Sequence, residues 1–300
     1  MMPMIPYVFF GTGEIAVGAL EELEKALLMP SLLVTVPDRP AGRGRTMTPP
    51  PAKVWAVAHG IKTVQPEKLD QDFFYELAKT KADVYVVVDY GKFLPKALLD
   101  IPARGVINMH PSLLPRLRGP SPIRSAILTD EKKTGVSIMR VDSKMDHGPI
   151  IASRPVSIPD WPSRGRDLDA LLSHQGGKLL AEILPHWVSG DVESHEQNHD
   201  VATISTLFKK EDGLLDLVNG DPYTNLLKIR AFDGWPGTYT FFEKDGEKMR
   251  VKILDAHMEN KKIVIDTVKP EGKREMKYAD FAVPGTSIIA PSGPDINTPA

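Results

Sequence analysis

Cysteine is absent from the 300-residue chain, and so are the features that mark secreted and membrane proteins. Without cysteine the chain can form no disulfide bond, no thiolate zinc site and no cysteine nucleophile. The segment from Met1 to Pro6 has no basic region of the kind that opens a signal peptide, and no apolar run reaches the roughly 18 residues that a membrane span needs. We therefore expect a cytoplasmic protein with no membrane partner.

An excess of positive charge is absent too. The chain has 37 Lys and Arg residues against 39 Asp and Glu, which gives a formal net charge of -2. This balance excludes a chain-wide basic field that attracts nucleic acid, so any contact with RNA must be local. With 42% hydrophobic and 25% charged residues, the composition is that of a globular protein with room for one large domain and a smaller one. We expect it to act as a monomer.

The first 189 residues alternate short apolar runs with segments of helical spacing. This alternation predicts an α/β fold, with a doubly wound, mainly parallel sheet of the Rossmann-like type and a ligand site beyond the carboxyl ends of its strands. The expected strands cover residues 7–10, 32–36, 62–64, 84–88, 105–108, 135–141 and 150–158, and the expected helices cover 14–28, 52–59, 73–79, 94–99 and 168–187.

The pattern changes after a polar stretch that has the composition of a linker. Short apolar segments follow, separated by turn residues such as Asp245 and Gly246, and they favour a small antiparallel β-barrel of the OB-like kind. The sequence therefore predicts a large domain over residues 1–189, a linker over 190–206 and a β-barrel domain over 207–300.

An amide and an imidazole stand two residues apart where a short β-branched strand ends. Alternate residues of a strand share a face, so Asn108 and His110 project together about 6.6 Å apart, and Pro111 ends the pairing. Their N–H groups can both point at one oxygen, which is how a developing oxyanion is stabilised. Asp146, farther along the chain, would favour the protonated histidine, a better donor. Together they indicate acyl transfer, although each residue alone could be a turn cap, a rim residue or a surface acid.

Two neighbours of Asp146 compete for a place in the same site. His147 is adjacent to it and should point to another side, so we interpret His147 as a rim residue. Asp142 lies four residues earlier and either pairs with Asp146 on one loop or forms a turn.

A glycine-rich turn supports a rival interpretation. Gly11, Thr12 and Gly13 begin a G-x-G-x-x-A pattern between a strand and a helix, as in dinucleotide-binding proteins. A nicotinamide enzyme would also use an acid such as Asp38 to bind ribose. Asp38 lies between two prolines, however, in a sequence more typical of a turn, and glycine in such a turn often serves packing alone.

Two further segments could meet RNA. The long loop at residues 37–51 carries Arg39, Arg43 and Arg45, a cationic group that suits phosphate or a nucleobase but that also occurs on solvated loops. The segment at 229–237 combines arginine with aromatic residues and could stack on a base. We expect buried packing to be the use of Phe232 and Trp235.

These residues resemble a known family. The block from Asn108 to Pro115 with the later Asp146 is similar to the folate-dependent formyltransferases, and the loop at 37–44 and the block at 229–237 narrow the resemblance to the branch that acts on methionyl-tRNA. The resemblance implies 10-formyltetrahydrofolate as donor, the α-amino group of methionine on initiator tRNA as acceptor, and no metal.

The family also implies roles for the residues. Asn108 and His110 would stabilise the tetrahedral intermediate, while Asp146 would hold the histidine and an ordered water. The arginine loop would enter the acceptor-stem region, chiefly through Arg43, and the barrel would steady the tRNA. The implied folate-binding residues are Val87, Val88, Asp89, Tyr90, Gly91, Ser112, Leu113, Leu114, Pro115 and Asp142, and the implied tRNA-binding residues are Arg39, Arg43 and Arg45.

Some residues depart from the family, and two other functions stay open. Asp89 stands where the family has a small residue, and His147 replaces the usual threonine. A sugar-nucleotide N-formyltransferase would share the Asn, His and Asp set but would have no reason to carry the arginine loop. A catalytically silent folate- or tRNA-binding module would bind its ligand without turnover.

Overall fold

The computed structural model describes residues 5–42 and 44–290, which form two compact units. The first unit contains residues up to 122 together with 133–157 and 169–205, and the second contains 123–132, 158–168 and the residues from 206 onward. Arg43, the residue predicted to be chief in tRNA binding, lies outside the described residues.

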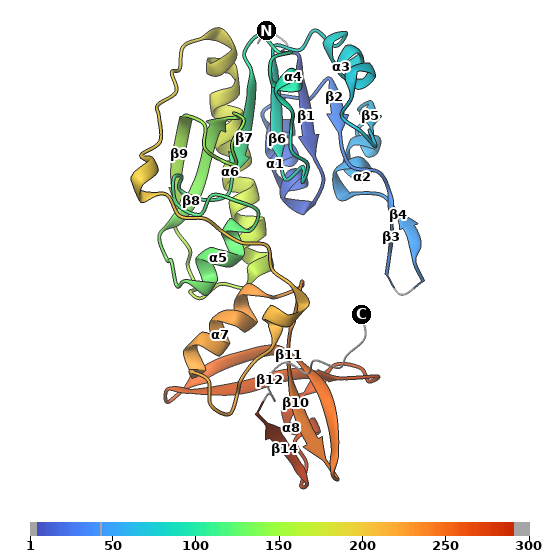
Figure 1. Cartoon of the computed structure of the whole chain (residues 1–300), viewed down its shortest axis with the longest axis vertical. Coiled ribbons are helices and arrows are strands. Elements are labelled where there is room, and N and C mark those ends of the chain that lie inside the picture. The colour runs from blue at the N-terminus through green and yellow to red at the C-terminus, as the bar shows by residue number, and fades with distance from the viewer. Residues whose placement is uncertain (1–4, 43, 291–300) are drawn as a thin grey trace. The chain divides into compact units, whose positions relative to one another are not determined.

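A seven-stranded sheet forms the centre of the first unit (Figure 1). Its order is β5-β2-β1-β6-β7-β8-β9, with parallel pairing from β5 to β7 and antiparallel pairing at β8 and β9. The predicted mainly parallel sheet is therefore confirmed. The strands are β1 (Tyr7–Gly11), β2 (Leu32–Val34), β5 (Thr63–Val64), β6 (Val84–Val88), β7 (Val106–His110), β8 (Thr134–Arg140) and β9 (Ile150–Val156).

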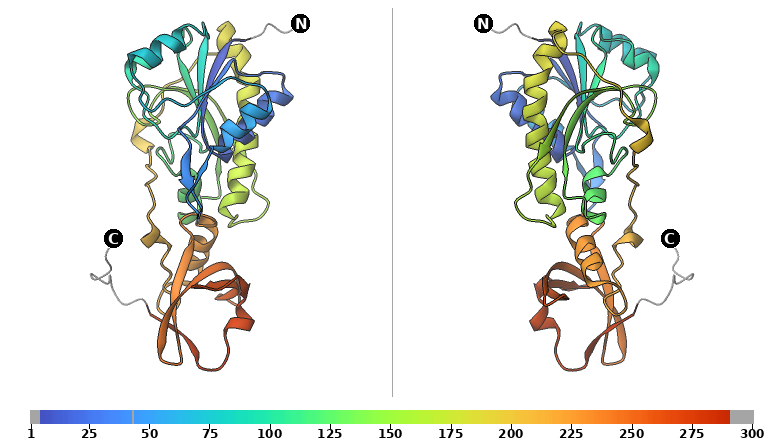
Figure 2. Two further views of the ribbon diagram at one scale, coloured as in Figure 1. Left: turned by 90° about the vertical axis from the view of Figure 1, so that its right-hand side faces the viewer. Right: turned by 90° about the vertical axis from the view of Figure 1, so that its left-hand side faces the viewer.

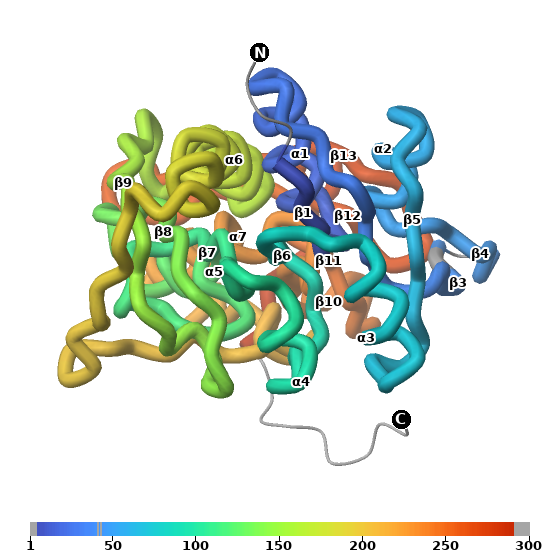
Figure 3. The backbone as a smooth tube through the Cα atoms, turned by 90° about the horizontal axis from the view of Figure 1, so that it is seen from above, coloured from blue at the N-terminus to red at the C-terminus, as the bar shows by residue number. Residues whose placement is uncertain are grey.

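Helices cover both faces of this sheet, with α1, α2 and α6 on one side and α3 and α4 on the other (Figure 3). Along α1 the buried positions Ala16, Leu20 and Leu23 recur at helical spacing and direct one stripe of the helix inward. On the opposite face, Phe10 and Tyr85 pack against the helices within one apolar cluster. The helices are α1 (Glu14–Lys25), α2 (Pro51–Ala58), α3 (Gln71–Ala78), α4 (Lys96–Leu99) and α6 (Gly165–Ser189), whose first turn belongs to the second unit.

Four elements were absent from the sequence-based prediction. The stretch predicted to be a long loop contains a hairpin of β3 (Arg39–Ala41) and β4 (Thr46–Thr48). Helices α5 (Pro122–Leu128) and α7 (Pro222–Ala231) were not predicted. The first has only two turns and so shows little periodicity. The sequence did mark the start of α7. Asp221 caps the helix by accepting the N–H of Thr224, and Pro222 occupies the first turn.

The second unit contains a five-stranded antiparallel sheet in the order β13-β12-β11-β10-β14, which Figure 2 shows as strongly curved. Alternate residues of β10, such as Thr240 and Phe242, are fully buried beneath it. The predicted antiparallel β structure at the end of the chain is thus confirmed. Its elements are β10 (Thr238–Lys244), β11 (Glu247–Glu259), β12 (Lys262–Pro270), β13 (Met276–Lys277), α8 (Tyr278–Phe281) and β14 (Thr286–Ile289).

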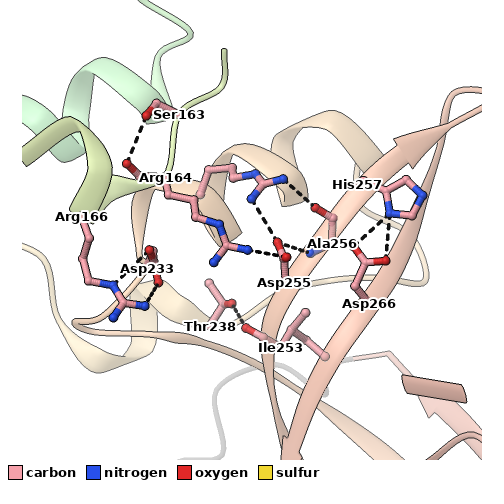
Figure 4. A network of polar contacts seen from close by, with 11 residues as sticks. Ser163, Arg164, Arg166, Asp233, Thr238, Ile253, Asp255, Ala256, His257 and Asp266 are labelled. Carbon is pink, nitrogen blue, oxygen red and sulfur yellow. Dashed lines mark hydrogen bonds and ion pairs between the residues drawn. The ribbon is translucent and has the colours of Figure 1, made fainter. Parts of the chain in front are cut away.

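A carboxylate on β11 ties distant segments of the second unit together (Figure 4). Asp255 accepts a hydrogen bond from Arg230 at 3.0 Å and forms an ion pair with Arg164. Arg166 and Asp233 form a second ion pair between the same regions, with 2.7 Å between Nη2 and Oδ1. These contacts hold residues 158–168 against α7 and β11 within one unit.

No helix in the described part of the chain is both long and apolar enough to span a membrane.

Candidate active site

The carboxyl end of β7 carries the predicted amide and imidazole. Asn108 lies opposite Val87 on β6 and opposite Met139 on β8, so it stands between two neighbouring strands. His110 is the last residue of β7 and pairs with Ser137. The structure therefore places Asn108 and His110 at the sheet edge where ligand sites of open α/β sheets lie.

His110 is buried, and both of its ring nitrogens face protein groups. Its Nε2 atom lies 2.9 Å from the carbonyl oxygen of Leu117. Because a carbonyl oxygen can only accept, Nε2 carries the hydrogen of this bond. The other nitrogen, Nδ1, faces Asp146, with 3.7 Å between Nδ1 and Oδ2.

Asp146 lies at the centre of the candidate site. Its Oδ2 atom accepts a hydrogen bond of 2.7 Å from the backbone N–H of Gly119, and its Oδ1 atom accepts a longer one of 3.4 Å from Nδ2 of Asn108. Gly119 has a φ of 106°, and a Cβ there would lie 2.8 Å from the carbonyl oxygen of Ser205, so only glycine fits. The structure thus brings together the three residues predicted to be catalytic.

This arrangement suits stabilisation of an oxyanion. The Asn108 amide has a second N–H group, and the side chain is only half-buried, so a ligand can reach it. The carboxylate of Asp146 faces both the Asn108 amide and the His110 imidazole and can hold their orientation. Preorganised donors of this kind act on charge that develops during a reaction.

Two uses were left open for Asp142, pairing with Asp146 or forming a turn, and its contacts are those of a turn, because its Oδ1 atom accepts the N–H of Lys144 at 2.8 Å. Asp142 contacts His147 instead of Asp146, with 2.7 Å between Oδ2 and Nδ1. The ring of His147 stacks on that of His199, with the centroids 4.1 Å apart. Asp142 and Asp146 therefore have separate partners.

Part of the predicted folate-binding segment along β6 packs in the protein core and does not face solvent. Val88 is buried, and the ring of Tyr90 packs edge-on against Phe10 in the core at a centroid distance of 5.3 Å. Val87 is half-buried beside Asn108, and a Cβ on Gly91 would meet no atom within 4 Å. The open space therefore lies at Gly91.

Asp89 faces the glycine-rich turn. Its Oδ2 atom accepts a hydrogen bond of 3.2 Å from the N–H of Gly13, and a Cβ on Gly13 would lie 2.4 Å from that oxygen. Although the residue is exposed at the surface, the protein around its carboxyl group raises the pKa of Asp89 to about 6 by desolvation. The N–H of Gly13 opposes this rise, and the charge of Asp169 adds to it.

The same contacts disfavour a dinucleotide at the turn. A bound pyrophosphate would need the N–H groups of the turn, but the Asp89 carboxylate already faces Gly13 and would repel a phosphate. Asp38, the acid expected to bind ribose, accepts hydrogen bonds from Lys53 at 2.8 Å and Gln65 at 2.7 Å. These partners lower the pKa of Asp38, with the Lys53 hydrogen bond the largest cause.

The segment after β7 is held by hydrogen bonds to other parts of the protein. The Ser112 hydroxyl donates to the carbonyl oxygen of Arg116 at 2.6 Å, and the Leu114 N–H donates to Ser137 Oγ at 3.1 Å. Both residues are buried. Leu113 and Pro115 are half-buried, so they are the members of this predicted folate set that keep some surface.

The remaining predicted residues differ in their exposure. Arg39 and Arg45 are exposed on the β3–β4 hairpin. Phe232 is buried as expected, but Trp235 is 59% exposed, so the expectation of buried packing was wrong for this residue. It lies in the turn that follows α7. In the described residues no group of three or more His, Cys, Asp or Glu side chains could hold a metal ion.

Sequence reasoning gave no role to two residues next to the site. Arg118 and Gln197 are both buried, and their side chains bond to each other at 3.0 and 2.6 Å. Gln197 lies in the polar stretch predicted to be a linker. Its composition resembles that of an exposed segment, so only the fold reveals that this glutamine is enclosed.

Comparison with known proteins defines the class first. The family described as formyl transferase matches residues 6–184, more than half of the chain, and this region contains the site around Asn108, His110 and Asp146.

Individual relatives are more specific. The methionyl-tRNA formyltransferase of Chloroflexus aggregans is 44% identical over 246 residues, which cover 81% of this chain and 78% of that protein. The methionyl-tRNA formyltransferase of Myxococcus xanthus is 36% identical over 301 residues, covering 91% and 93%. The chain therefore belongs to the methionyl-tRNA formyltransferase family, and the resemblance seen in its sequence is confirmed.

Solved structures agree on the fold. The methionyl-tRNA formyltransferase from Clostridium thermocellum has a TM-score of 0.59 at 17% identity and covers 89% of this chain and 98% of that one. A sugar N-formyltransferase from a Shewanella species has a TM-score of 0.59 at 16% identity, covering 82% and 95%. At these identities the likeness establishes the architecture alone.

Proposed function

We propose that the protein transfers the formyl group of 10-formyltetrahydrofolate to the α-amino group of methionine on initiator Met-tRNA. The observation that carries this proposal is the convergence of Asn108, His110 and Gly119 on the Asp146 carboxylate, in a chain that belongs to the methionyl-tRNA formyltransferase family. The folate is a co-substrate that supplies an activated formyl group. Val87, the open space at Gly91, Leu113 and Pro115 are the surfaces proposed to meet it.

In the proposed reaction the amine nitrogen bonds to the formyl carbon, and the bond from that carbon to N10 of the folate breaks. The free N–H of Asn108 borders this carboxylate, so a formyl oxygen placed there would meet a donor from the amide. Because Nε2 of His110 already donates to the carbonyl oxygen of Leu117, His110 adds a second donor there, at Nδ1, only as the imidazolium. Asp146 accepts the proton that the amine loses, and this proton is passed on to N10. No covalent bond to the enzyme is needed.

The acceptor is proposed to contact two surfaces. One is the β3–β4 hairpin with the exposed Arg39 and Arg45. The other is the solvent-facing side of β10 and β11.

Aromatic and cationic side chains alternate on that side of the second unit's sheet. Tyr239 lies opposite Lys252, and Phe241 lies opposite Arg250. The guanidinium carbon of Arg250 is 3.6 Å from the centroid of the Tyr239 ring, and Lys248 Nζ is 4.4 Å from that of Phe241. Cations interleaved with aromatic rings suit RNA, because they offer both charge for phosphates and faces for bases.

A comparison of acceptors tests the proposal. The purified protein would be given 10-formyltetrahydrofolate with initiator Met-tRNA, with the same tRNA carrying N-acetylated methionine, or with an amino-sugar nucleotide. We expect formylation of Met-tRNA alone, since the blocked amine cannot attack. Formylation of the amino sugar in preference to Met-tRNA would replace the proposal with the sugar alternative, and binding of ligands without any product would indicate a silent module.

A further inference from the structure

The buried side chain of Gln197 joins two loops of the candidate site within the first unit. Its Nε2 atom donates to the carbonyl oxygen of Asp146 at 2.9 Å and to that of Gly148 at 2.7 Å. Its Oε1 atom accepts from Nε and Nη2 of Arg118, at 3.0 and 2.6 Å. The amide thus connects the turn that carries Asp146 with the segment that precedes Gly119.

The chemistry of the partners fixes the orientation of this amide. Carbonyl oxygens only accept and a guanidinium only donates, so Nε2 must face Asp146 and Gly148 while Oε1 faces Arg118. Both N–H groups and both lone pairs of Gln197 are then used. A fully satisfied buried amide holds its neighbours in one arrangement, and its loss leaves buried partners without bonds.

The contacts of Gln197 bear directly on the position of the Asp146 carboxylate. The backbone of Asp146 has a φ of 47°, a conformation that needs support in a residue other than glycine. Gln197 supplies this support at the carbonyl oxygen of the same residue. On the other side, Arg118 directly precedes Gly119, whose N–H binds Oδ2 of Asp146.

The rest of the same segment supports the partner of His110. We call residues 197–205 the strap. Thr203 Oγ1 accepts the N–H of Leu117 at 2.8 Å, and the carbonyl oxygen of Thr203 accepts the N–H of Arg118 at 2.9 Å. Leu117 is the residue whose carbonyl oxygen receives Nε2 of His110. The strap therefore holds the backbone on both sides of the imidazole and carboxylate pair.

We propose that Gln197 is a positioning residue for formyl transfer, which acts by holding the turn of Asp146 and, through Arg118, the N–H of Gly119 on the carboxylate. The inference rests on the proposed function of this site. Gln197 does not itself touch a substrate, so its removal lowers the rate of transfer and leaves substrate binding largely intact.

The test is a double-mutant cycle between Gln197 and Asp146. Gln197→Met keeps the length of the side chain and removes its hydrogen bonds. In single-turnover transfer from 10-formyltetrahydrofolate to Met-tRNA, we expect Gln197→Met to reduce the rate about tenfold or more in the wild-type background and less than about threefold in the Asp146→Asn background. KM for either substrate should change by less than about threefold.

A general structural role predicts different numbers. It would reduce the rate by the same factor in both backgrounds, and that result would overturn the proposal, as would an unchanged rate in Gln197→Met. Asn225→Leu is the matched control, since it removes a buried amide that donates to the carbonyl oxygen of Asp216 at 2.7 Å in the second unit. Asn225→Leu should lower the thermal midpoint and leave the rate of transfer unchanged.

A milder variant covers the case in which Gln197→Met does not fold. Thr203→Val is isosteric and removes the acceptor for the Leu117 N–H. We expect a rate reduction of about threefold to tenfold without a change in KM. A wild-type rate in this variant would show that the strap does not position His110. Failure of the proposed function would be recognised separately, because the wild-type protein would then show no transfer at all.

Discussion

At the scale of single residues, charge and hydrogen-bond geometry determine the character of the site. Asp146 receives N–H groups from the backbone and from Asn108, and it faces the imidazole of His110. Because its backbone and side chain are both held, the carboxylate orients the donors at little further entropic cost. The carboxylate of Asp146 is thus the common neighbour of Asn108, His110 and Gly119.

A second carboxylate, Asp89, gives a pH-dependent prediction. Its folded-state pKa of about 6 lies above the ordinary value of 3.8, so the folded protein binds more protons here than the unfolded chain between these two values. The contribution of Asp89 to stability therefore falls as pH rises from about 4 to 6. Asn tolerates the positive φ of 53° at this position. Asp89→Asn should therefore raise the thermal midpoint relative to wild type at pH 7, and this gain should vanish near pH 4.

Asp38→Asn is the control of opposite sign. The pKa of Asp38 is lowered by Lys53 and Gln65, so its contribution to stability is present above its ordinary value of 3.8 and is lost as pH falls below it. This variant should be less stable than wild type at pH 7 and should approach it in acid. A pH-independent difference between Asp89→Asn and wild type would contradict the assignment.

At the scale of elements, one ion-pair cluster joins α7 and β11 in the second unit. Asp255 has two arginine partners and is 28% exposed at its side chain. Asp255→Asn would leave both guanidinium groups without their counter-charge, and we expect it to reduce the free energy of unfolding of this unit by about 2 kcal/mol, measured by denaturant titration. On the neighbouring strand, Asp266→Asn removes the exposed contact with His257 and should have little effect. Equal losses of unfolding free energy in the two variants would show that the Asp255 cluster stabilises the unit no more than an exposed ion pair does.

Elements were predictable from the sequence where hydrophobic spacing was strong. Strand β6 was expected at its observed bounds, because its all-apolar run is typical of a strand buried on both faces. The β3–β4 hairpin was not expected, since residues 46–48 of β4 are exposed and the two strands give no apolar alternation. Helix α7 was not predicted, although Asp221 and Pro222 give the signal of a helix start.

The candidate site was predictable to a different extent. Asn108, His110 and Asp146 could be named because their residue types and the strand end point to one chemistry. Their bonds to Gly119 and Leu117, and the enclosure of Gln197, depend on how distant segments pack. The exposure of Trp235 could not be predicted either, since the sequence does not show whether a neighbour covers an aromatic residue in a turn.

At the scale of the whole molecule, the net charge of -2 limits how the protein can hold RNA. Affinity for tRNA must come from a few local cations, so the salt dependence of binding should respond strongly to single arginines. We expect the double variant Arg39→Ala, Arg45→Ala to weaken binding of Met-tRNA and to reduce the slope of log affinity against log salt by about 2. Folate binding should not change.

The matched control is Lys68→Ala, which removes an exposed cation outside the hairpin and the second unit's sheet. Its salt slope should equal that of the wild type. If both variants gave the wild-type slope, the hairpin would not contact phosphate, and the acceptor would have to be held elsewhere.

The most direct test of the account is the initial rate of folate-dependent formylation of initiator Met-tRNA by the purified protein, with His110→Ala alongside the wild type. His110 lies at the end of β7 with its imidazole between the carbonyl oxygen of Leu117 and the carboxylate of Asp146. The account predicts formyl-Met-tRNA from the wild type and a rate at least about a hundredfold lower in His110→Ala. The absence of product from the wild type, or an equal rate in both proteins, would contradict it.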